Sequence, residues 1–409
     1  MTENMIILAI ESSCDETAAA LIEGKADKIK VISNVVSSQI KIHRPYGGVI
    51  PELAARNHIK NILPVINEAL SPCPLSRRAG EGKRVPPYGG TSGVRAIAVT
   101  TGPGLISSLL IGVETAKALS FAWRQPLVGV NHLAGHIYSN FIGNSSPHLH
   151  RGVLNPNTNF GVGVNPAGKN ITGRCGDKKI KFPALVLIVS GGHTELVLMR
   201  GHFKFKLLGQ TRDDAAGEAF DKAAKILGLG YPGGPAIAAA ATKTSNIKYP
   251  TSNINLPRPM LNDATFDFSF SGLKTALLYK IQGDKNWRHK IPAYCAEFQQ
   301  AIIDVLISKT VKAAKKYKVK SVMLAGGVAA NVELRRQLKR TLERTLPKTA
   351  YFMPDLKYTT DNAAMIAVAG YFYIKALKPR RTILRGRQKN ITARKPRGIR
   401  VDCNQSLTK

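Results

Sequence analysis

The alternation of apolar and polar positions predicts strands joined by small polar turns in the first half of the chain. Short apolar runs predict strands at residues 6–10, 18–22, 30–37, 96–99 and 127–130. Helices are expected at 51–70, at 105–123 and directly after Val130. Pro64 lies inside the first of these helices and should interrupt or kink it, because proline lacks a backbone N–H.

The second half repeats the same plan. Strands are expected at residues 184–189, 195–199, 203–208 and 321–324, and helices at 215–227, 293–316, 328–342 and from 360 onwards. A strand hairpin followed by alternating helices and strands, present twice, indicates an internal duplication. We therefore expect an α/β protein of two similar lobes that face each other across a central cleft, where ligands commonly bind.

The same pattern sets the expected domain boundaries. Residues 1–143 form the first lobe, 182–355 the second, and 356–375 a final helix that returns to the first lobe. Two stretches rich in Gly, Pro and polar residues, about 71–95 and 144–181, are interpreted as surface insertions. Residues 376–409 lack hydrophobic periodicity and are expected to be a disordered tail.

The charge balance of the 409-residue chain is strongly basic. Lys and Arg number 59 against 26 acidic residues, a net charge of +33. The stretch from Lys375 to Lys409 carries +11, so the remainder carries +22. A field of this sign attracts RNA, DNA or anionic membrane. A basic composition without any such ligand is the alternative.

Cysteine content and hydropathy indicate a cytoplasmic protein. The five cysteines are scattered without a CxxC pair, which disfavours a cysteine zinc site and suits reduced thiols. The N-terminal apolar run is short and ends at Glu11, unlike a signal peptide. No stretch of 18 uncharged apolar residues occurs, so no membrane span is expected.

Three turns of small residues follow predicted strands, at Glu11–Thr17, Ser190–Thr194 and Ala325–Val328. Small residues let phosphate oxygens approach backbone N–H groups closely. One such turn is typical of any tight corner, but three in equivalent places of a duplicated fold favour nucleotide binding. The sequence lacks GxxxxGK[ST], so a P-loop enzyme is disfavoured.

His132 and His136 are four residues apart on a predicted helix that follows a buried strand. This spacing puts both imidazoles on one helical face, within reach of one metal ion. Two unliganded core or surface histidines are the alternative. Leu133 stands where HExxH metalloproteases have glutamate, which disfavours that class. Asp361, at the start of the last helix, is a candidate third ligand.

Other polar motifs leave alternatives open. Asp213 and Asp214 suit charge compensation at a helix N-terminus, whereas Glu218 and Asp221, on one helical face, would suit a ribose or a metal. The turn Gly230–Pro235 could pass close to a nucleotide or form a tight corner. In the segment 46–58, Arg56 and His58 could meet phosphate or belong to a solvated helix face.

Six of these segments together resemble the tRNA N(6)-adenosine threonylcarbamoyltransferase family over roughly residues 6–373. They are Ile10–Thr17, Tyr46–His58, Asn131–His136, Val189–Thr194, Asp213–Lys222 and Thr360–Met365. The resemblance implies a two-lobed, actin-like ATPase fold. It also implies transfer of a threonylcarbamoyl group from threonylcarbamoyl-AMP to the N6 amine of adenosine 37, in tRNAs that read codons beginning with A.

The resemblance further implies a set of site residues. His132, His136 and Asp361 would hold a metal, Fe²⁺ ahead of Zn²⁺. The adenylate, or ATP, would lie in the cleft against Ile188, Val189, Ser190, Gly191, Gly192, Asp221, Gly234 and Asn331. Expected partners are tRNA, a non-catalytic paralogue and a small ATPase. The two insertions and the basic tail depart from the family pattern.

A base for the acceptor amine is a separate hypothesis of ours. Asp15 or Glu16, in the turn after the first strand, could accept the proton that the attacking N6 amine loses. The competing functions are a non-catalytic scaffold paralogue, a metalloprotease and a sugar kinase. Retention of both histidines and Asp361 argues against a scaffold, and the missing HExxH glutamate against a protease. A sugar kinase would need neither the histidine pair nor so basic a surface.

Overall fold

The computed structural model describes residues 4–71, 93–142, 179–243, 254–377 and 399–408. Its first sheet has the strand order β3-β2-β1-β4-β5. The strands are β1 (Met5–Glu11), β2 (Glu16–Lys25), β3 (Lys28–Ser38), β4 (Val94–Gly102) and β5 (Leu127–Asn131). The first three strands form an antiparallel meander, and β4 and β5 continue the sheet parallel to β1.

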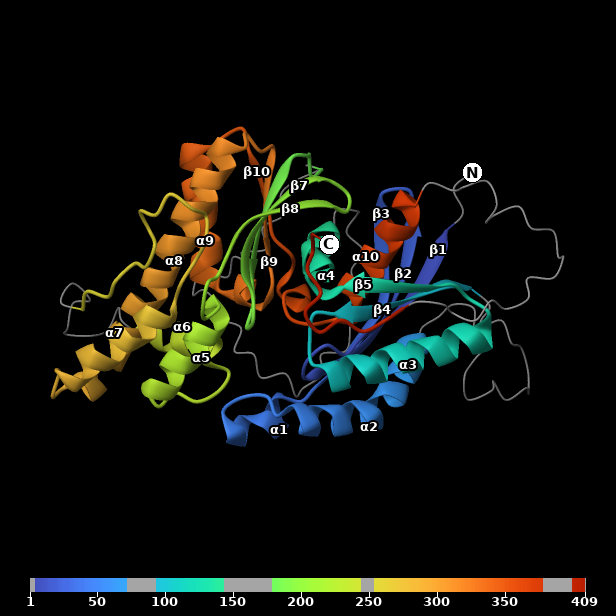
Figure 1. Ribbon diagram of the computed structural model, residues 1–409, viewed down its shortest axis with the longest axis horizontal. Helices are drawn as coiled ribbons and strands as arrows, with labels where there is room; N and C mark the ends of the chain where they lie inside the picture. The colour runs from blue at the N-terminus through green and yellow to red at the C-terminus, as the bar shows by residue number, and fades with distance from the viewer. Residues whose placement is uncertain (1–3, 72–92, 143–178, 244–253, 378–398, 409) are drawn as a thin grey trace.

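The second sheet repeats this connectivity in the order β10-β9-β6-β7-β8. Its strands are β6 (Ala184–Val189), β7 (Thr194–Gly201), β8 (Lys204–Gln210), β9 (Ser321–Ala325) and β10 (Ala350–Phe352). Here too an antiparallel meander, β6 to β8, is extended by two parallel strands. The predicted duplication into two α/β lobes is therefore confirmed, as Figure 1 shows.

Helices of the first lobe cover both faces of its sheet. α2 (Pro51–Leu70) and α3 (Ile106–Trp123) lie side by side on the outer face, with the short α1 (Ile40–His43) before them (Figure 1). Their apolar stripes pack on inward-facing strand residues such as Leu8, Leu21 and Val99. Burial of these stripes holds the helices to the sheet.

Two further helices occupy the space between the sheets. α4 (His132–Tyr138) contacts β5, β6 and β9, and α10 (Ala363–Ala376) lies across β1, β2 and β3 and also packs on α4 (Figure 1). A single buried cluster includes Ala98 of the first sheet, Val186 and Met199 of the second, and Ala367 of α10. The two lobes thus share part of one core, built around α4 and α10.

The remaining helices belong to the second lobe. They are α5 (Ala216–Ile226), α6 (Gly233–Ala241), α7 (Ser271–Gln282), α8 (Ile291–Lys316) and α9 (Val332–Thr345). They pack around a buried cluster that includes Phe220, Phe268 and Phe298. In the part of the chain that the structure describes, no helix is long and apolar enough to cross a membrane.

Several local predictions are corrected by the structure. α2 runs without interruption through Pro64, since this residue lies on the exposed face where water can satisfy the freed carbonyl. α6, α7 and β10 are additional to the predicted elements. The last helix begins at Ala363, because Asn362 Oδ1 caps it by accepting from Met365 N (3.0 Å).

The C-terminal tail differs from expectation in its last part. Residues Ile399–Thr408 lie against the first lobe, where Asp402 N donates to Thr101 O (2.9 Å) and Ile399 and Val401 pack on its core. The prediction that all of 376–409 is disordered is therefore wrong for this segment. Backbone hydrogen bonds help to fix this segment on the lobe, and hydrophobic periodicity does not reveal such bonds. The predicted insertions, about 71–95 and 144–181, fall mostly outside the described residues.

The second-lobe core gives a first stability prediction. Phe298 is fully buried and its ring meets that of Phe220 edge-on. Replacing it with alanine should lower the free energy of unfolding by about 3–5 kcal/mol, since a large cavity is left. Urea denaturation followed by circular dichroism measures this. Tyr279→Ala, at a position 68% exposed, should change stability by less than about 0.5 kcal/mol, and equal losses in both would contradict this packing.

Candidate metal centre

The helix that carries both histidines is fixed at its first turn. Asn131 ends β5, and its Oδ1 accepts a hydrogen bond from Ala134 N (3.0 Å), which caps α4. His132 and His136 then lie one helical turn apart and are both buried. Their rings meet edge-on, with centroids 4.6 Å apart. The sequence spacing therefore delivers two imidazoles to one buried point.

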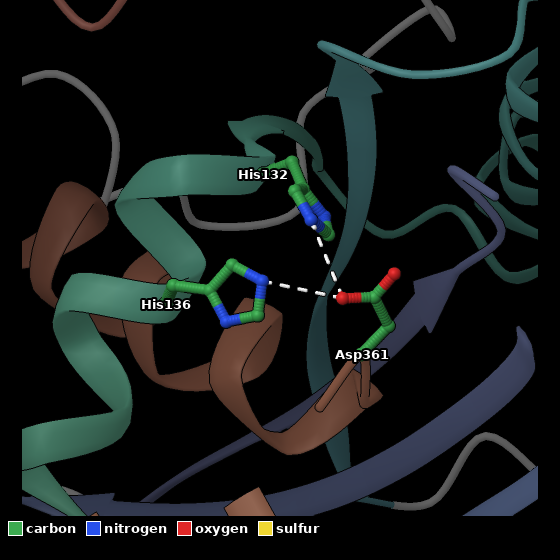
Figure 2. A group of neighbouring side chains, drawn as sticks. All are labelled: His132, His136 and Asp361. Atoms are coloured by element: carbon green, nitrogen blue, oxygen red, sulfur yellow. Dashed lines mark ion pairs between the residues drawn. The ribbon is translucent and has the colours of Figure 1, made fainter. Parts of the chain in front are cut away.

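Asp361 reaches this point from the connection just before α10. Figure 2 shows its carboxylate facing both rings, with Oδ1 3.4 Å from His132 Nε2 and 3.2 Å from His136 Nε2. One potential ligand atom from each of the three residues lies within 4.8 Å of the others. The packing of α10 on α4 brings Asp361 to residues more than 200 positions earlier in the chain.

The donor set fits a divalent metal ion. Ligand atoms that bind a metal at about 2.0–2.1 Å in tetrahedral geometry stand roughly 3.3 Å apart, close to the two observed separations. Among the described residues, neither buried ring nitrogen of His136 makes a hydrogen bond, and Nε2 has the Asp361 carboxylate as its charged neighbour. Such groups are rarely left unsatisfied inside proteins unless a ligand uses them. Three protein ligands would also leave coordination positions open for a substrate.

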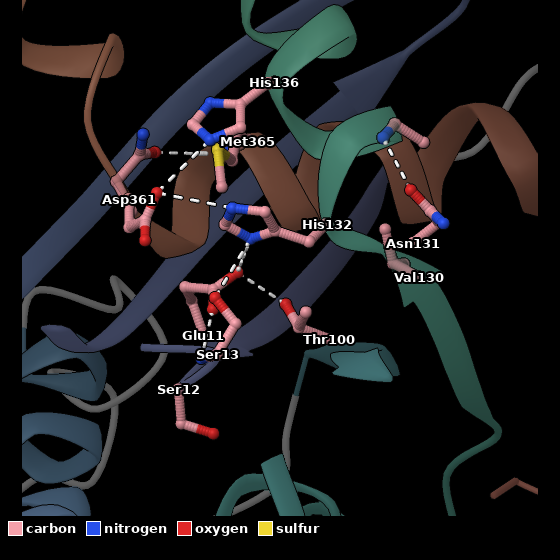
Figure 3. A network of polar contacts seen from close by, with 12 residues as sticks. Glu11, Ser12, Ser13, Thr100, Val130, Asn131, His132, His136, Asp361 and Met365 are labelled. Carbon is pink, nitrogen blue, oxygen red and sulfur yellow. Dashed lines mark hydrogen bonds and ion pairs between the residues drawn. The ribbon is translucent and has the colours of Figure 1, made fainter. Parts of the chain in front are cut away.

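Glu11 supports this centre from below, at the end of β1 (Figure 3). Its Oε2 lies 3.1 Å from His132 Nδ1 and accepts from Thr100 Oγ1 (2.6 Å). Its Oε1 accepts from Ser13 N (2.6 Å), and Ser13 Oγ is 3.1 Å from His132 Nδ1. A carboxylate on the far nitrogen orients a histidine and leaves its Nε2 free for a metal.

The charges of the site are strongly coupled. Burial opposes protonation of His132, but the carboxylates of Asp361 and Glu11 outweigh burial and raise its pKa to about 9. Burial would raise the pKa of Asp361, yet the neighbouring histidines lower it to about 2. For His136, burial is the largest effect and lowers the pKa. Glu11 and Asp361 thus provide the negative charge that a buried cation requires.

The two proposed carboxylates of the β1–β2 turn lie close to one another. Glu16 Oε1 accepts from Ser38 Oγ (3.0 Å), and Asp15 is buried, with its carbonyl accepting from Gln39 N (3.1 Å). Burial, followed by the charge of Asp15, raises the pKa of Glu16 well above its usual range. Burial therefore favours the protonated form of Glu16 over its carboxylate. The charge of Asp361 also raises the pKa of Glu16, so this turn lies within electrostatic reach of the candidate metal centre.

The predicted adenylate residues of the β6–β7 turn lie beside the start of α5. Ile188 and Val189 are buried in β6, and the carbonyls of Ser190 and Gly191 accept from Gly217 N (3.2 Å) and Glu218 N (3.1 Å). A Cβ at Gly191 or Gly192 would meet no protein atom within 4 Å. The backbone of this turn is therefore open, and packing within the protein does not require glycine at either position.

The other predicted adenylate residues lie at, or contact, the starts of α6 and α9. Asp221 Oδ1 accepts from Gly233 N (2.7 Å) at the first turn of α6, and burial raises the pKa of this carboxyl. Gly234 is also open, since a Cβ there meets nothing within 4 Å. Asn331 caps α9 through Leu334 N (3.0 Å) and donates from Nδ2 to Gln299 Oε1 (2.8 Å).

Other polar motifs have structural partners. His58 is buried and lies 2.7 Å from Thr17 Oγ1, so it supports the β1–β2 turn. Arg56 is exposed and pairs with Glu52 (2.6 Å). Asp213 accepts from the start of α7, at Phe270 N (2.8 Å), which differs from the expected role at its own helix.

Asp214 and Glu218 both pair with Lys222, at 2.6 Å and 2.9 Å. Glu218 is therefore occupied by a neighbouring lysine, and its predicted contact with a ribose or metal has no support from this geometry. The turn Gly230–Pro235 forms the corner that leads into α6.

Sequence reasoning missed three residues around the centre. Glu11 ends β1 and Thr100 lies two residues before the end of β4, and both precede small turns, a position that could have marked them. His193, in the Ser190–Thr194 turn, lies near enough to both metal-site histidines that their charges, after burial, help lower its pKa to about 4.

Comparison with known proteins now adds to this geometry. The sequence profile of the tRNA N6-adenosine threonylcarbamoyltransferase family matches residues 30–150 and 162–368. The chain belongs to this transferase family. Two tRNA N6-adenosine threonylcarbamoyltransferases illustrate the similarity. The one from Syntrophomonas wolfei is 44% identical over 376 residues, covering 91% of this chain and 94% of that protein. The Bacillus subtilis one is 45% identical over 370 residues, covering 90% of each.

A solved structure carries the same fold. The structure of HypF from T. kodakarensis aligns with 91% of this chain and 48% of its own length, with a TM-score of 0.52 and 14% identity. At this identity the likeness concerns the fold alone. The two-lobed, actin-like architecture that the resemblance implied for this transferase family member is confirmed.

The contact between Glu11 and His132 yields a prediction on metal affinity. Glu11→Gln keeps the shape of the side chain but removes its charge from His132 Nδ1. Metal affinity should fall about 10–100-fold, as is usual when such a supporting partner is lost. Calorimetric titration with Zn²⁺ measures it, with the exposed Glu114→Gln as matched control. An unchanged affinity in Glu11→Gln would show that this contact does not support the site.

Proposed function

We propose that this protein transfers the threonylcarbamoyl group of threonylcarbamoyl-AMP to the N6 amine of adenosine 37, in tRNAs that read codons beginning with A. The observation that carries the proposal is the cluster of the buried His132 and His136 with the partly exposed Asp361, in a member of this transferase family. The product is threonylcarbamoyladenosine. The reaction is an acyl transfer to RNA, which we assign to the cytoplasm.

The metal of the proposed enzyme is Fe²⁺, with Zn²⁺ as the alternative. Two histidines and one carboxylate with open positions are a ligand set typical of non-haem iron. When bound, such an ion supplies a Lewis acid that can hold the donor and polarise its carbonyl. The chain contributes His132, His136 and Asp361 as ligands, and Glu11 fixes the ring of His132.

The adenylate donor is assigned to the open turns of the second lobe. Gly191, Gly192 and Gly234 have neither a left-handed backbone nor a close neighbour that excludes a side chain. Close approach of a phosphate or ribose would explain glycine at these positions. Ile188, Val189, Ser190, Asp221 and Asn331 complete the proposed donor site, and ATP could occupy the same place.

The acceptor is a polyanion, in agreement with the charge of the chain. A net charge of +33 favours capture of tRNA through its phosphates. In the reaction, N6 of the adenine forms a bond to the carbamoyl carbon, and the bond from that carbon to the AMP oxygen breaks. AMP leaves with the bonding electrons, and N6 loses a proton. Holding both reactants in line supplies a large part of the rate.

Asp15 is the preferred acceptor of that proton. Burial and the charge of Asp15 raise the pKa of Glu16 and so favour its protonated form. A protonated carboxyl cannot serve as a base, but it can donate a hydrogen bond that positions its neighbour.

Protein partners are proposed on the outer face of the first lobe. α2 and α3 expose Ile59, Leu63, Ile106, Leu110 and Phe121. Neighbouring helices with exposed apolar side chains are typical of protein interfaces. We assign this face to the non-catalytic paralogue, and the small ATPase of the pathway is the second proposed partner.

One assay tests the proposed function. The full chain, with partner proteins added, is incubated with threonylcarbamoyl-AMP and unmodified tRNA, and nucleosides are analysed by mass spectrometry. Threonylcarbamoyladenosine should form, and Asp361→Ala should lower the rate about 100-fold or more because a ligand is lost. Asp355→Ala, an exposed carboxylate on the same connection, is the control. Absence of product with all partners present would contradict the function.

The base assignment has its own prediction. Asp15→Asn should lower the single-turnover transfer rate about 10²–10⁴-fold, the usual contribution of a general base. Glu16→Gln should cost far less, since an amide also donates a hydrogen bond. Metal content, measured in parallel, should match the unsubstituted protein in both variants. Undiminished transfer in Asp15→Asn would refute the role of Asp15.

A further inference from the structure

The end of the chain lies between the two lobes, next to α4 (Figure 1). Residues Ile399–Thr408 form a segment that we name the C-terminal strap. It lies alongside the carboxyl end of β4. Asp402 N donates to Thr101 O (2.9 Å), and Gly104 N donates to Cys403 O (3.2 Å). A Cβ at Gly102 would overlap the carbonyl oxygen of Asp402. Such close backbone approach indicates a specific docking site.

Apolar contacts anchor both ends of the strap. Ile399 and Val401 pack on the outer core of the first lobe, and Leu407 packs on the cluster shared by both lobes. Between these anchors, Thr101 Oγ1 donates to Gln405 Oε1 (3.1 Å). The strap is therefore held by backbone bonds, a side-chain bond and apolar burial along its length.

The strap also contacts the residue that fixes the metal-site helix. Asn131 Nδ2 donates to Gln405 O (3.2 Å), while Oδ1 of the same amide caps α4 by accepting from Ala134 N. A fixed amide orients the first turn of α4 and with it His132. Thr101, the second contact of Gln405, follows Thr100, which donates to Glu11.

The strap closes one side of a cavity beside this helix. The cavity, about 360 Å³, is lined by Leu133 of α4, by His193 and Glu195 of the second lobe, and by residues 403–408. Leu133 directly follows His132. The strap thus borders the space next to the candidate ligands as well as the cap of their helix.

We propose that the C-terminal strap is a positioning element of the metal centre, which fixes the orientation of His132 through Asn131 and Thr101. Gln405 is its central positioning residue, since it contacts both. The strap does not touch the metal or the substrate in this role. It raises metal affinity by ordering a ligand before the metal binds.

The test uses Co²⁺ as a spectroscopic probe in the full chain. Val401→Asp/Leu407→Asp should displace the strap, because it introduces charge at both apolar anchors. Co²⁺ affinity should fall about tenfold, and the visible absorption bands of bound Co²⁺ should shift. Ser406→Ala/Thr408→Ala is the matched control, since among the described residues these hydroxyls pair with each other and with Thr408 N of the strap itself. Its affinity and spectrum should be unchanged.

A peptide rescue experiment distinguishes a loss of positioning from a general loss of folding. A synthetic peptide of residues 399–409 should restore Co²⁺ affinity and spectrum to the displaced variant, and the peptide with both aspartates should not. Asp402→Pro, which removes the N–H that bonds Thr101 O and the carboxylate that accepts from Asn404 N, should show a smaller loss and decides the question if the double variant does not fold. Unchanged Co²⁺ binding in a folded variant whose strap has become accessible to protease would overturn the proposal. This readout does not depend on the proposed transfer reaction.

Discussion

The packing of α10 against α4 between the two sheets is the contact on which this structure depends. It joins the cores of both lobes and brings Asp361 to His132 and His136. α10 is apolar almost throughout, and α4 is buried along its whole length, so burial of their apolar side chains is strongly favourable. Asn131 and Asn362 cap the two helix starts within the same small region. The packing of α10 on α4 therefore both stabilises the fold and sets the geometry of the site.

Burial also explains the chemistry that the site can support. The carboxylates of the buried Glu11 and the partly exposed Asp361 are held against two buried histidines. Two neighbouring carboxylates in such a place are stable only beside positive charge, and a divalent cation would supply it. The open glycines of the second lobe belong to the donor site that we propose for the phosphate-bearing part of the adenylate. In the proposed function, the first lobe therefore holds the metal and the second lobe holds the nucleotide.

The sequence predicted these features to different degrees. Strand periodicity predicted the two lobes, and the spacing of His132 and His136 predicted two candidate ligands, because both patterns are local. Asp361 was a candidate third ligand from its place at the start of the last helix, but only tertiary packing brings it near the histidines. Glu11 was overlooked as a partner of His132, although it ends a buried strand. The strap was mistaken for disorder because its backbone bonds to Thr101 and Gly104 leave no periodic signal.

The central claim is that His132, His136 and Asp361 bind one metal ion. Anomalous diffraction from crystals grown without oxygen, recorded above and below the iron absorption edge, tests it most directly. A single strong peak is expected roughly 2.0–2.2 Å from His132 Nε2, His136 Nε2 and Asp361 Oδ1. A crystal of fully active protein without a peak among these three atoms would contradict it.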